Sequence, residues 1–330
     1  MRIGGRTTAS RDSRGGFVTA DQLHRGGTVV ADSAEPSARV DACVILAGGL
    51  RALPIVRETQ RSALDLWVGS RGTLFDQWLR RLSAICAPGA SIRVIHDKST
   101  PAPEPPEGAH GLGVSVATDR GEYRGPAGVV KDVTTDLPED ATILIADAAR
   151  WCAPDLTQLV ATHARTGGAV TVGANPDDSP AGVYLARRAS LDLTPAKGFF
   201  DLKEQWLGKL KASGERIGVH RFSDVGLTAT PTREAVIALA RDLAGMTRAQ
   251  LCEDGWPRAT VPPSGVFRTI AADAEVAADA ILVDAVVMPR AVVGAGAVVV
   301  RSLVCSGATV GASARLVDTV APARAVRVEG

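Results

Sequence analysis

Residues 276–314 read VAADAILVDAVVMPRAVVGAGAVVVRSLVCSGATVGASA, and this stretch repeats itself. A pentad that begins with an aliphatic residue and ends with alanine recurs along it and just before it. The pentads start at Ile270, Val276, Val287, Val293, Val304 and Val310. Their starts are separated by 6, 11, 6, 11 and 6 residues, so the pattern returns every 17 residues. A fixed period of this kind is typical of a repeat architecture.

The 17-residue period has a physical explanation. Three short strands per turn make a triangular coil with one aliphatic side chain per face pointing inward, and small residues fit the tight corners. A single turn cannot bury its own apolar face, whereas stacked turns can. The pattern resembles the hexapeptide-repeat left-handed parallel β-helix, which we expect over residues 265–330. An antiparallel sheet rich in Ala and Val is the alternative, and the repetition of one fixed period disfavours it.

Short apolar strands alternate with helical patterns upstream of the repeat. Strands are predicted at 42–47, 91–96, 142–146, 169–173 and 182–185, and helices at 73–86, 154–165, 202–210 and 232–243. This alternation predicts a Rossmann-like α/β domain over residues 41–247, with a mixed, mostly parallel sheet and helices on both faces. Ligands of such sheets bind beyond the carboxyl ends of the strands. That rule brings Gly48, Gly49 and Asp147 to the functional edge.

Two further segments lack the periodic apolar pattern of residues that form a buried core. Residues 1–40 are rich in Arg, Gly, Ser and Thr, and we expect them to form a disordered tail. Residues 248–264 contain Gly255, Pro257, Pro262 and Pro263 and are predicted to link the two domains.

Composition excludes several classes of function. The chain has 37 Lys plus Arg against 36 Asp plus Glu, a balance that disfavours nucleic-acid and membrane-surface partners. No apolar run approaches the roughly 18 residues of a membrane-spanning helix. The 5 cysteines contain no C-x-x-C pair, which argues against a zinc site. Their odd number, without a secretory leader, predicts a reducing cytoplasm.

Three motifs carry candidate chemistry. The strand at 42–47 runs into Gly48-Gly49, and Arg51, Pro54 and Arg61 follow it. Residues 125–131 read GPAGVVK. Glycines let backbone N–H groups approach phosphates, and arginines offset phosphate charge.

The third motif is a pair of carboxylates that lie far apart in the chain. Asp147 ends the strand at 142–146, and Asp224 stands in the sequence Ser223-Asp224-Val225-Gly226. Hard cations such as Mg²⁺ prefer oxygen ligands of this kind. A helix N-cap is the alternative for Asp147, and a turn-capping role is the alternative for Asp224.

The order of these motifs resembles the sugar-1-phosphate nucleotidyltransferase (NDP-sugar pyrophosphorylase) family, in particular its mannose-1-phosphate guanylyltransferase-like members with a C-terminal left-handed β-helix. The resemblance implies a nucleotide-diphospho-sugar transferase fold and transfer of NMP from an NTP to a sugar-1-phosphate, with release of pyrophosphate. It also implies the roles of individual residues. These are nucleotide binding by Ala47, Gly48, Gly49, Gly125, Ala127 and Gly128, catalysis by Arg51 and Arg61, Mg²⁺ binding by Asp147 and Asp224, and sugar binding by Gly182.

The chain departs from the family pattern at several positions. Arg61 stands where the family has lysine, and Ala146 stands where it has glycine. The Glu-Lys-Pro motif before the sugar-binding strand is absent, and Lys197 or Lys203 could replace its lysine. These departures leave two hypotheses, an active transferase or a silent relative that binds a nucleotide or nucleotide-sugar and regulates or scaffolds a partner. An acyltransferase in the repeat is disfavoured because the repeat contains no histidine. Aliphatic faces of the repeat suggest a homo-oligomer.

Overall fold

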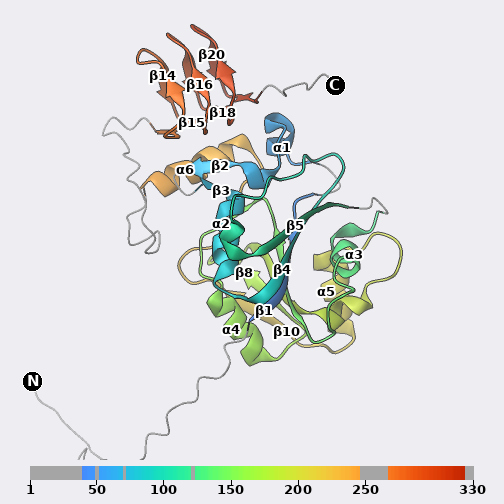
Figure 1. Ribbon diagram of the computed structural model, residues 1–330. Coiled ribbons are helices and arrows are strands. Elements are labelled where there is room, and N and C mark those ends of the chain that lie inside the picture. Colours follow the sequence, from blue (N-terminus) through green and yellow to red (C-terminus); the bar gives the residue numbers. More distant parts are fainter. Residues whose placement is uncertain (1–38, 49–51, 70–71, 120–122, 246–266, 324–330) are drawn as a thin grey trace, which may run out of the picture. The chain divides into compact units, whose positions relative to one another are not determined.

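The computed structural model describes residues 39–48, 52–69, 72–119, 123–245 and 267–323. An α/β domain comes first along the chain, and a stack of short parallel strands follows it (Figure 1). The tail predicted at 1–40, apart from its last two residues, and the linker predicted at 248–264 lie outside this range. The helices of the described part are too short or too polar to cross a membrane.

The α/β domain is built on a seven-stranded sheet with the order β10-β8-β9-β6-β1-β4-β5. Its strands are β1 (Val40–Leu46), β4 (Cys86–His96), β5 (Gly113–Thr118), β6 (Thr142–Asp147), β8 (Val170–Ala174), β9 (Pro180–Arg187) and β10 (Ile217–Arg221). Only β9 runs antiparallel to its neighbours, β6 and β8. The prediction of a mixed, mostly parallel sheet is therefore confirmed.

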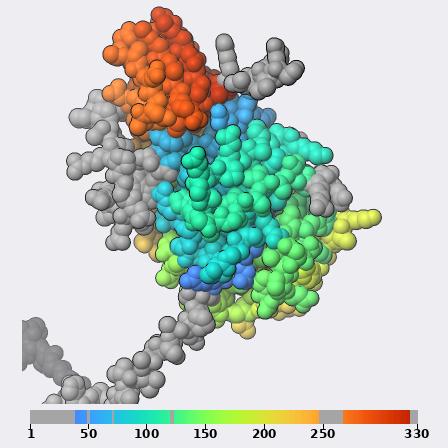
Figure 2. Space-filling model, in the orientation of Figure 1, coloured from blue at the N-terminus to red at the C-terminus, as the bar shows by residue number. Residues whose placement is uncertain are grey.

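Helices cover both faces of this sheet, as the unbroken apolar run of β1 requires. Ile45 packs with α2 (Leu74–Ser83) and α4 (Thr157–Thr166) on one face. The preceding residue, Val44, points to the other face and packs with α3 (Gly125–Asp132) and α5 (Leu207–Ala212). The residues of the α/β domain, coloured blue to yellow, form a continuous surface on the face shown in Figure 2.

Helix α2 illustrates how local sequence sets an element. Thr73 caps its first turn in a reciprocal capping box with Asp76. Phe75, Trp78 and Leu79 then recur on one face and are fully buried. The helix ends at Ser83, earlier than predicted, because β4 already begins at Cys86.

Several short elements were not predicted from the sequence. The two that matter for the site are β7 (Arg150–Cys152) and β11 (Leu227–Ala229), which pair antiparallel outside the main sheet. The others are β5 and β10 of the main sheet, helix α3, α1 (Pro54–Thr59), η1 (Ala63–Asp65), β2 (Trp67–Gly69), β3 (Gly72–Thr73), η2 (Ala109–Gly111) and η3 (Arg188–Leu193). The helix predicted at 202–210 corresponds to the π-helical turn η4 (Leu202–Trp206) followed by α5. Helix α6 (Arg233–Gly245) corresponds to the helix predicted at 232–243.

The C-terminal strands form three parallel sheets, β12-β15-β18-β21, β13-β16-β19 and β14-β17-β20. Val276 pairs with Val293, which pairs in turn with Val310, so the 17-residue period is the register of the stack. The antiparallel alternative is wrong. The strands are β12 (Arg268–Ile270), β13 (Glu275–Val276), β14 (Ile281–Val283), β15 (Ala285–Val287), β16 (Val292–Val293), β17 (Val298–Val300), β18 (Leu303–Val304), β19 (Thr309–Val310), β20 (Arg315–Val317) and β21 (Val320–Ala321).

The stack gives a direct stability prediction. Val299 is fully buried inside the middle layer, whereas its neighbour Val300 on the same strand is partly exposed. We expect Val299→Ala to lower the free energy of unfolding by about 2 kcal/mol, because it leaves a cavity. Val300→Ala, the matched control, should cost less than about 1 kcal/mol. Urea unfolding of both variants checks this, and equal losses would contradict the inward and outward assignment.

Candidate functional site

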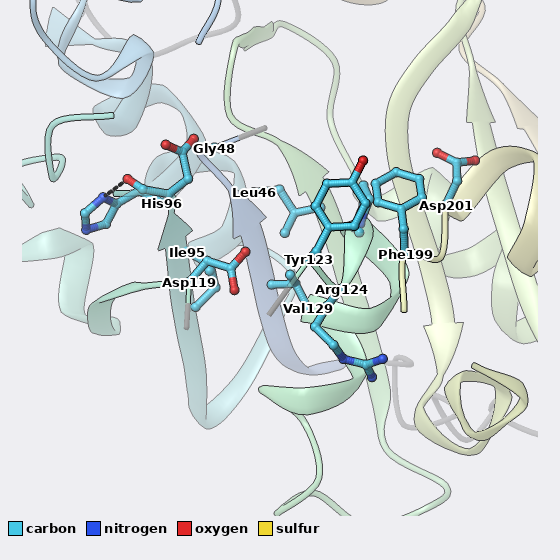
Figure 3. A pocket seen from close by; sticks show the side chains of 13 residues that line it. Leu46, Gly48, Ile95, His96, Asp119, Tyr123, Arg124, Val129, Phe199 and Asp201 are labelled. Carbon is cyan, nitrogen blue, oxygen red and sulfur yellow. Dashed lines mark hydrogen bonds between the residues drawn. The ribbon is translucent and has the colours of Figure 1, made fainter. Parts of the chain in front are cut away.

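A pocket of about 430 Å³ opens at the carboxyl ends of β1, β4 and β5, beside the first turn of α3 (Figure 3). This is the edge at which parallel sheets of this class bind ligands. The pocket is lined by Leu46, Gly48, Ile95, His96, Asp97, Asp119, Tyr123, Arg124, Gly125, Pro126, Val129, Phe199 and Asp201.

Two aromatic rings form one wall of this pocket. Tyr123 and Phe199 lie with their ring centroids 5.4 Å apart, and the Tyr123 side chain is 65% exposed. Leu46, Ile95 and Val129 add an apolar lining. Flat apolar surfaces of this kind suit a planar ring such as a nucleobase.

The predicted glycine loop at 125–128 is the first turn of α3, held against residues 199–200. The Phe200 N–H donates to the Arg124 carbonyl at 2.8 Å, and the Ala127 N–H donates to the Phe200 carbonyl at 3.0 Å. Gly125 has φ +69°, and a Cβ there would collide with the backbone of Phe200. Gly128 and Ala127 are buried in the helix. The glycine at 125 therefore allows the close approach that shapes the pocket.

The side chain of Arg124 holds this turn in place through hydrogen bonds. Its guanidinium makes two bonds to the carboxylate of Asp132, at 2.7 and 2.9 Å, and donates to the Pro195 carbonyl at 2.9 Å. Only 4% of its side chain is exposed. In Figure 3 its guanidinium points away from the aromatic pair. Arg124 thus holds the wall of the pocket in position.

A second pocket, of about 320 Å³, adjoins the first through Gly48, which lines both. Ala47 and Asp147 also line it. A Cβ at Gly48 would collide with the backbone N and the carboxylate of Asp97, so glycine is required there. The carboxylate of Asp97 accepts from Ser99 and Thr100 and fixes the turn after β4.

Asp147 is already engaged within this second pocket. Its Oδ1 accepts from the Ala149 N–H at 3.1 Å, and its Oδ2 accepts from Arg150 Nε at 3.2 Å. The side chain of Arg150, on β7, is 15% exposed. Sequence analysis missed Arg150, because the short pair β7–β11 that positions it has no periodic signal.

A polar groove of about 580 Å³ continues from Arg150, which lines both the second pocket and the groove. Lys203 and Asn175 line the groove as well. Gly226 lies on its wall, two residues beyond Asp224. Asp224 itself is exposed and accepts from the Ser223 hydroxyl at 3.0 Å. The groove therefore carries two cationic side chains next to the Asp147 pocket.

Gly182, the predicted sugar-binding residue, lies beneath Arg150. Its φ is +72°, and a Cβ there would collide with the Arg150 side chain. Tyr184, two residues further along β9, is buried, and this burial raises its pKa to about 12. The charge of Asp201 raises the pKa further, and that of Arg150 lowers it. The Tyr184 phenol therefore stays protonated across the physiological pH range.

No family model and no curated protein matches the chain.

Of the two predicted catalytic arginines, Arg61 belongs to the described part of the chain, and it does not line these pockets. Arg51 and Gly49 lie outside the described range. Arg61 donates to the Ser306 carbonyl of the C-terminal stack at 3.2 Å. Arg61 is not among the described residues that line the three pockets. Its catalytic role therefore stays a prediction, and its contact in the structure links two segments of the chain.

Asp65, close to Arg61, gives a pH prediction. Burial raises the pKa of Asp65 from its usual 3.8 to about 6, although the Glu104 N–H, which donates to it at 3.0 Å, lowers it. The folded protein then binds the Asp65 proton more tightly than the unfolded chain does. The free energy of unfolding should fall by up to about 3 kcal/mol as pH rises from 4 to 6. Asp65→Asn should remove this fall, and urea unfolding across that pH window measures it. An unchanged pH dependence would contradict the assignment.

The surroundings of Asp147 bear on the predicted magnesium site. Both oxygens of Asp147 already accept hydrogen bonds, one of them from a cation. Within the described ranges, no three His, Cys, Asp or Glu side chains gather in a way that could hold a metal ion. Mg²⁺ requires near-octahedral oxygen ligands. As the side chains stand, Asp147 is paired with Arg150 and not with a metal ion, and the Mg²⁺ site at Asp147 and Asp224 stays a prediction.

Proposed function

We propose that this protein is a nucleotidyltransferase that transfers NMP from an NTP to a sugar-1-phosphate and releases pyrophosphate. We further propose that its sheet is of the Rossmann-like nucleotide-diphospho-sugar transferase type and that its C-terminal stack is a left-handed β-helix. A cytoplasmic location and a homo-oligomer formed through the β-helix belong to the same proposal, with neither nucleic acid nor membrane as a partner.

One observation carries the proposal. Three segments that sequence analysis selected independently line connected pockets at one sheet edge, since Gly48 is shared by the pocket with Gly125 and the pocket with Asp147. The segments are separated by tens of residues in the chain. Their convergence is what a nucleotide site at the carboxyl ends of parallel strands requires.

The lining suggests how the substrates would lie. The nucleobase would stack near Tyr123 and Phe199, and the phosphates would pass the backbone N–H groups near Gly48. The sugar phosphate would lie in the groove, with Arg150 and Lys203 offsetting its charge. Its phosphate oxygen would attack the α-phosphorus in line with the departing pyrophosphate. Positioning and charge stabilisation would supply most of the rate.

The test is a pyrophosphate-release assay. Purified protein is given each of the four common NTPs with several hexose-1-phosphates, in parallel with Mg²⁺ and with EDTA. We expect release that needs both substrates in at least one pair. Absence of release in every pair, under both conditions, would contradict the transferase proposal.

A silent binding protein is the second candidate, and the contact of Arg61 with Ser306 favours it. Because that guanidinium is occupied elsewhere, one of the two cations expected at the phosphates is missing. Calorimetry alongside the release assay separates the two candidates. Nucleotide binding without release would support the silent protein, and release would exclude it.

A further inference from the structure

We propose that Arg150 takes the place of a divalent cation at Asp147, so that the site binds the phosphate group of its sugar-phosphate ligand without a metal. This inference rests on the proposed function, because it assumes that the ligand of the groove carries a phosphate. It differs from the sequence-based expectation, in which Asp147 serves Mg²⁺.

The first observation behind this proposal is the position of the Arg150 guanidinium beside Asp147. Arg150 Nε lies 3.2 Å from Asp147 Oδ2, so a cationic group already neutralises this carboxylate. A metal ion bound at the same oxygen would stand against the guanidinium, and like charges at that distance repel strongly. Asp147 can therefore form an ion pair with Arg150 or bind a metal ion, but not both. In the structure it forms the ion pair with Arg150.

The backbone holds Arg150 in this position from both sides. Arg150 pairs with Ala229 in the β7–β11 sheet. The carbonyl of its neighbour Ala149 accepts from the Thr230 N–H at 2.9 Å and from the Thr230 hydroxyl at 3.1 Å. Gly182 leaves the space that the side chain fills. A side chain fixed in this way loses little freedom when it binds a ligand.

The remaining donors of Arg150 define the ligand. Within the described part of the chain, no acceptor is bonded to its two terminal amino groups, while its side chain lines the groove together with Lys203. A guanidinium presents its N–H groups as a planar fork that matches two oxygens of a phosphate. Asp177, the acidic residue among the described residues that line the groove, accepts a hydrogen bond at 2.6 Å from the hydroxyl of Ser179 in the same loop. The groove therefore suits a phosphate monoester dianion.

Calorimetry with glucose 1-phosphate and mannose 1-phosphate tests the inference. These probes avoid the complication that an NTP brings Mg²⁺ with it. The wild-type protein should bind at least one of them with Kd values in EDTA and in Mg²⁺ that agree within about threefold. Arg150→Ala should weaken binding in EDTA by about tenfold or more, because a charged hydrogen-bonding partner is lost. Added Mg²⁺ should restore part of that loss, since Asp147 is then free for it.

Matched variants exclude a loss of fold as the cause. Arg188→Ala is the control, because Arg188 is 12% exposed and forms a comparable ion pair with Asp192 at 2.8 Å, and it should bind as the wild type does. Arg150→Lys keeps the charge without the fork and should bind with intermediate affinity. Asp147→Asn, which releases Arg150 from its partner, should bind at least as tightly as the wild type in EDTA. Thermal unfolding accompanies every variant.

Each remaining outcome decides against the inference. Wild-type binding that needs Mg²⁺, equal binding by Arg150→Ala in EDTA, or loss of binding in Asp147→Asn would overturn it, while a phosphate-binding site would still stand. If neither sugar phosphate binds under either condition, this inference fails, and the pyrophosphate-release assay decides separately whether the proposed function stands.

Discussion

Replacing Gly125 with alanine is expected to lower the free energy of unfolding by about 3 kcal/mol or more and to abolish nucleotide binding. The residue has φ +69°, a conformation that costs an alanine roughly 1 kcal/mol or more. A Cβ would also meet the Phe200 backbone N and O at 2.7 Å each. That backbone cannot yield easily, because both atoms bond the turn around Gly125. Overpacking of this kind typically costs a further 1–3 kcal/mol.

Gly214→Ala is the matched control for this prediction. Gly214 has φ +79°, but nothing lies within 4 Å of its would-be Cβ. Only the conformational cost remains, so the variant should lose roughly 1 kcal/mol and bind nucleotide normally. Urea unfolding and calorimetry measure both quantities. Equal losses in the two variants would show that the contact with Phe200 does not shape the pocket.

Arg124→Ala is expected to have the second-largest effect, a loss of about 3 kcal/mol in the free energy of unfolding. Its side chain is 4% exposed and binds Asp132 through two nitrogens. Removing it leaves a cavity in the wall of the pocket, frees the Asp132 carboxylate and deprives the Pro195 carbonyl of its donor. Ligand affinity should fall as well, because the 199–200 segment loses its support. Urea-induced unfolding in low and high salt measures the loss, which should change little with salt.

Arg301→Ala separates burial from pairing. Arg301 forms an equally bidentate pair with Asp318, at 2.7 and 2.6 Å, but on the surface of the C-terminal stack. Exposed pairs of this kind contribute little, so this variant should unfold almost as the wild type does. A loss as large as that of Arg124→Ala would contradict the importance of burial.

Patterns that repeat locally could be read from the sequence. The 17-residue period required every strand of the C-terminal stack to pair with the strand one turn away, and Val286, Leu303 and Val320 do so. The strand at 142–146 was equally clear, because β6 is buried on both faces and shows a continuous apolar run. In both cases a short stretch of chain carries the whole signal.

Features that depend on distant contacts could not be read in this way. The ring pair of Tyr123 and Phe199 joins residues 76 positions apart. Arg150 acquires its place through β11, whose three residues have no pattern of their own. Arg61 was expected among the phosphates, yet it donates to a carbonyl 245 positions away. In each of these cases the tertiary structure, and not the motif, decides where a side chain lies.

The central claim is that the pockets around Gly48 bind a nucleotide. Hydrogen exchange with mass spectrometry, with and without saturating NTP, tests it on the unmodified protein. We expect slower exchange in peptides that cover 95–97, 123–129 and 199–201, and unchanged exchange in the strands of the C-terminal stack. Slower exchange confined to other peptides would contradict nucleotide binding at the pockets around Gly48. Unchanged exchange in every peptide with each of the four common NTPs would contradict it as well.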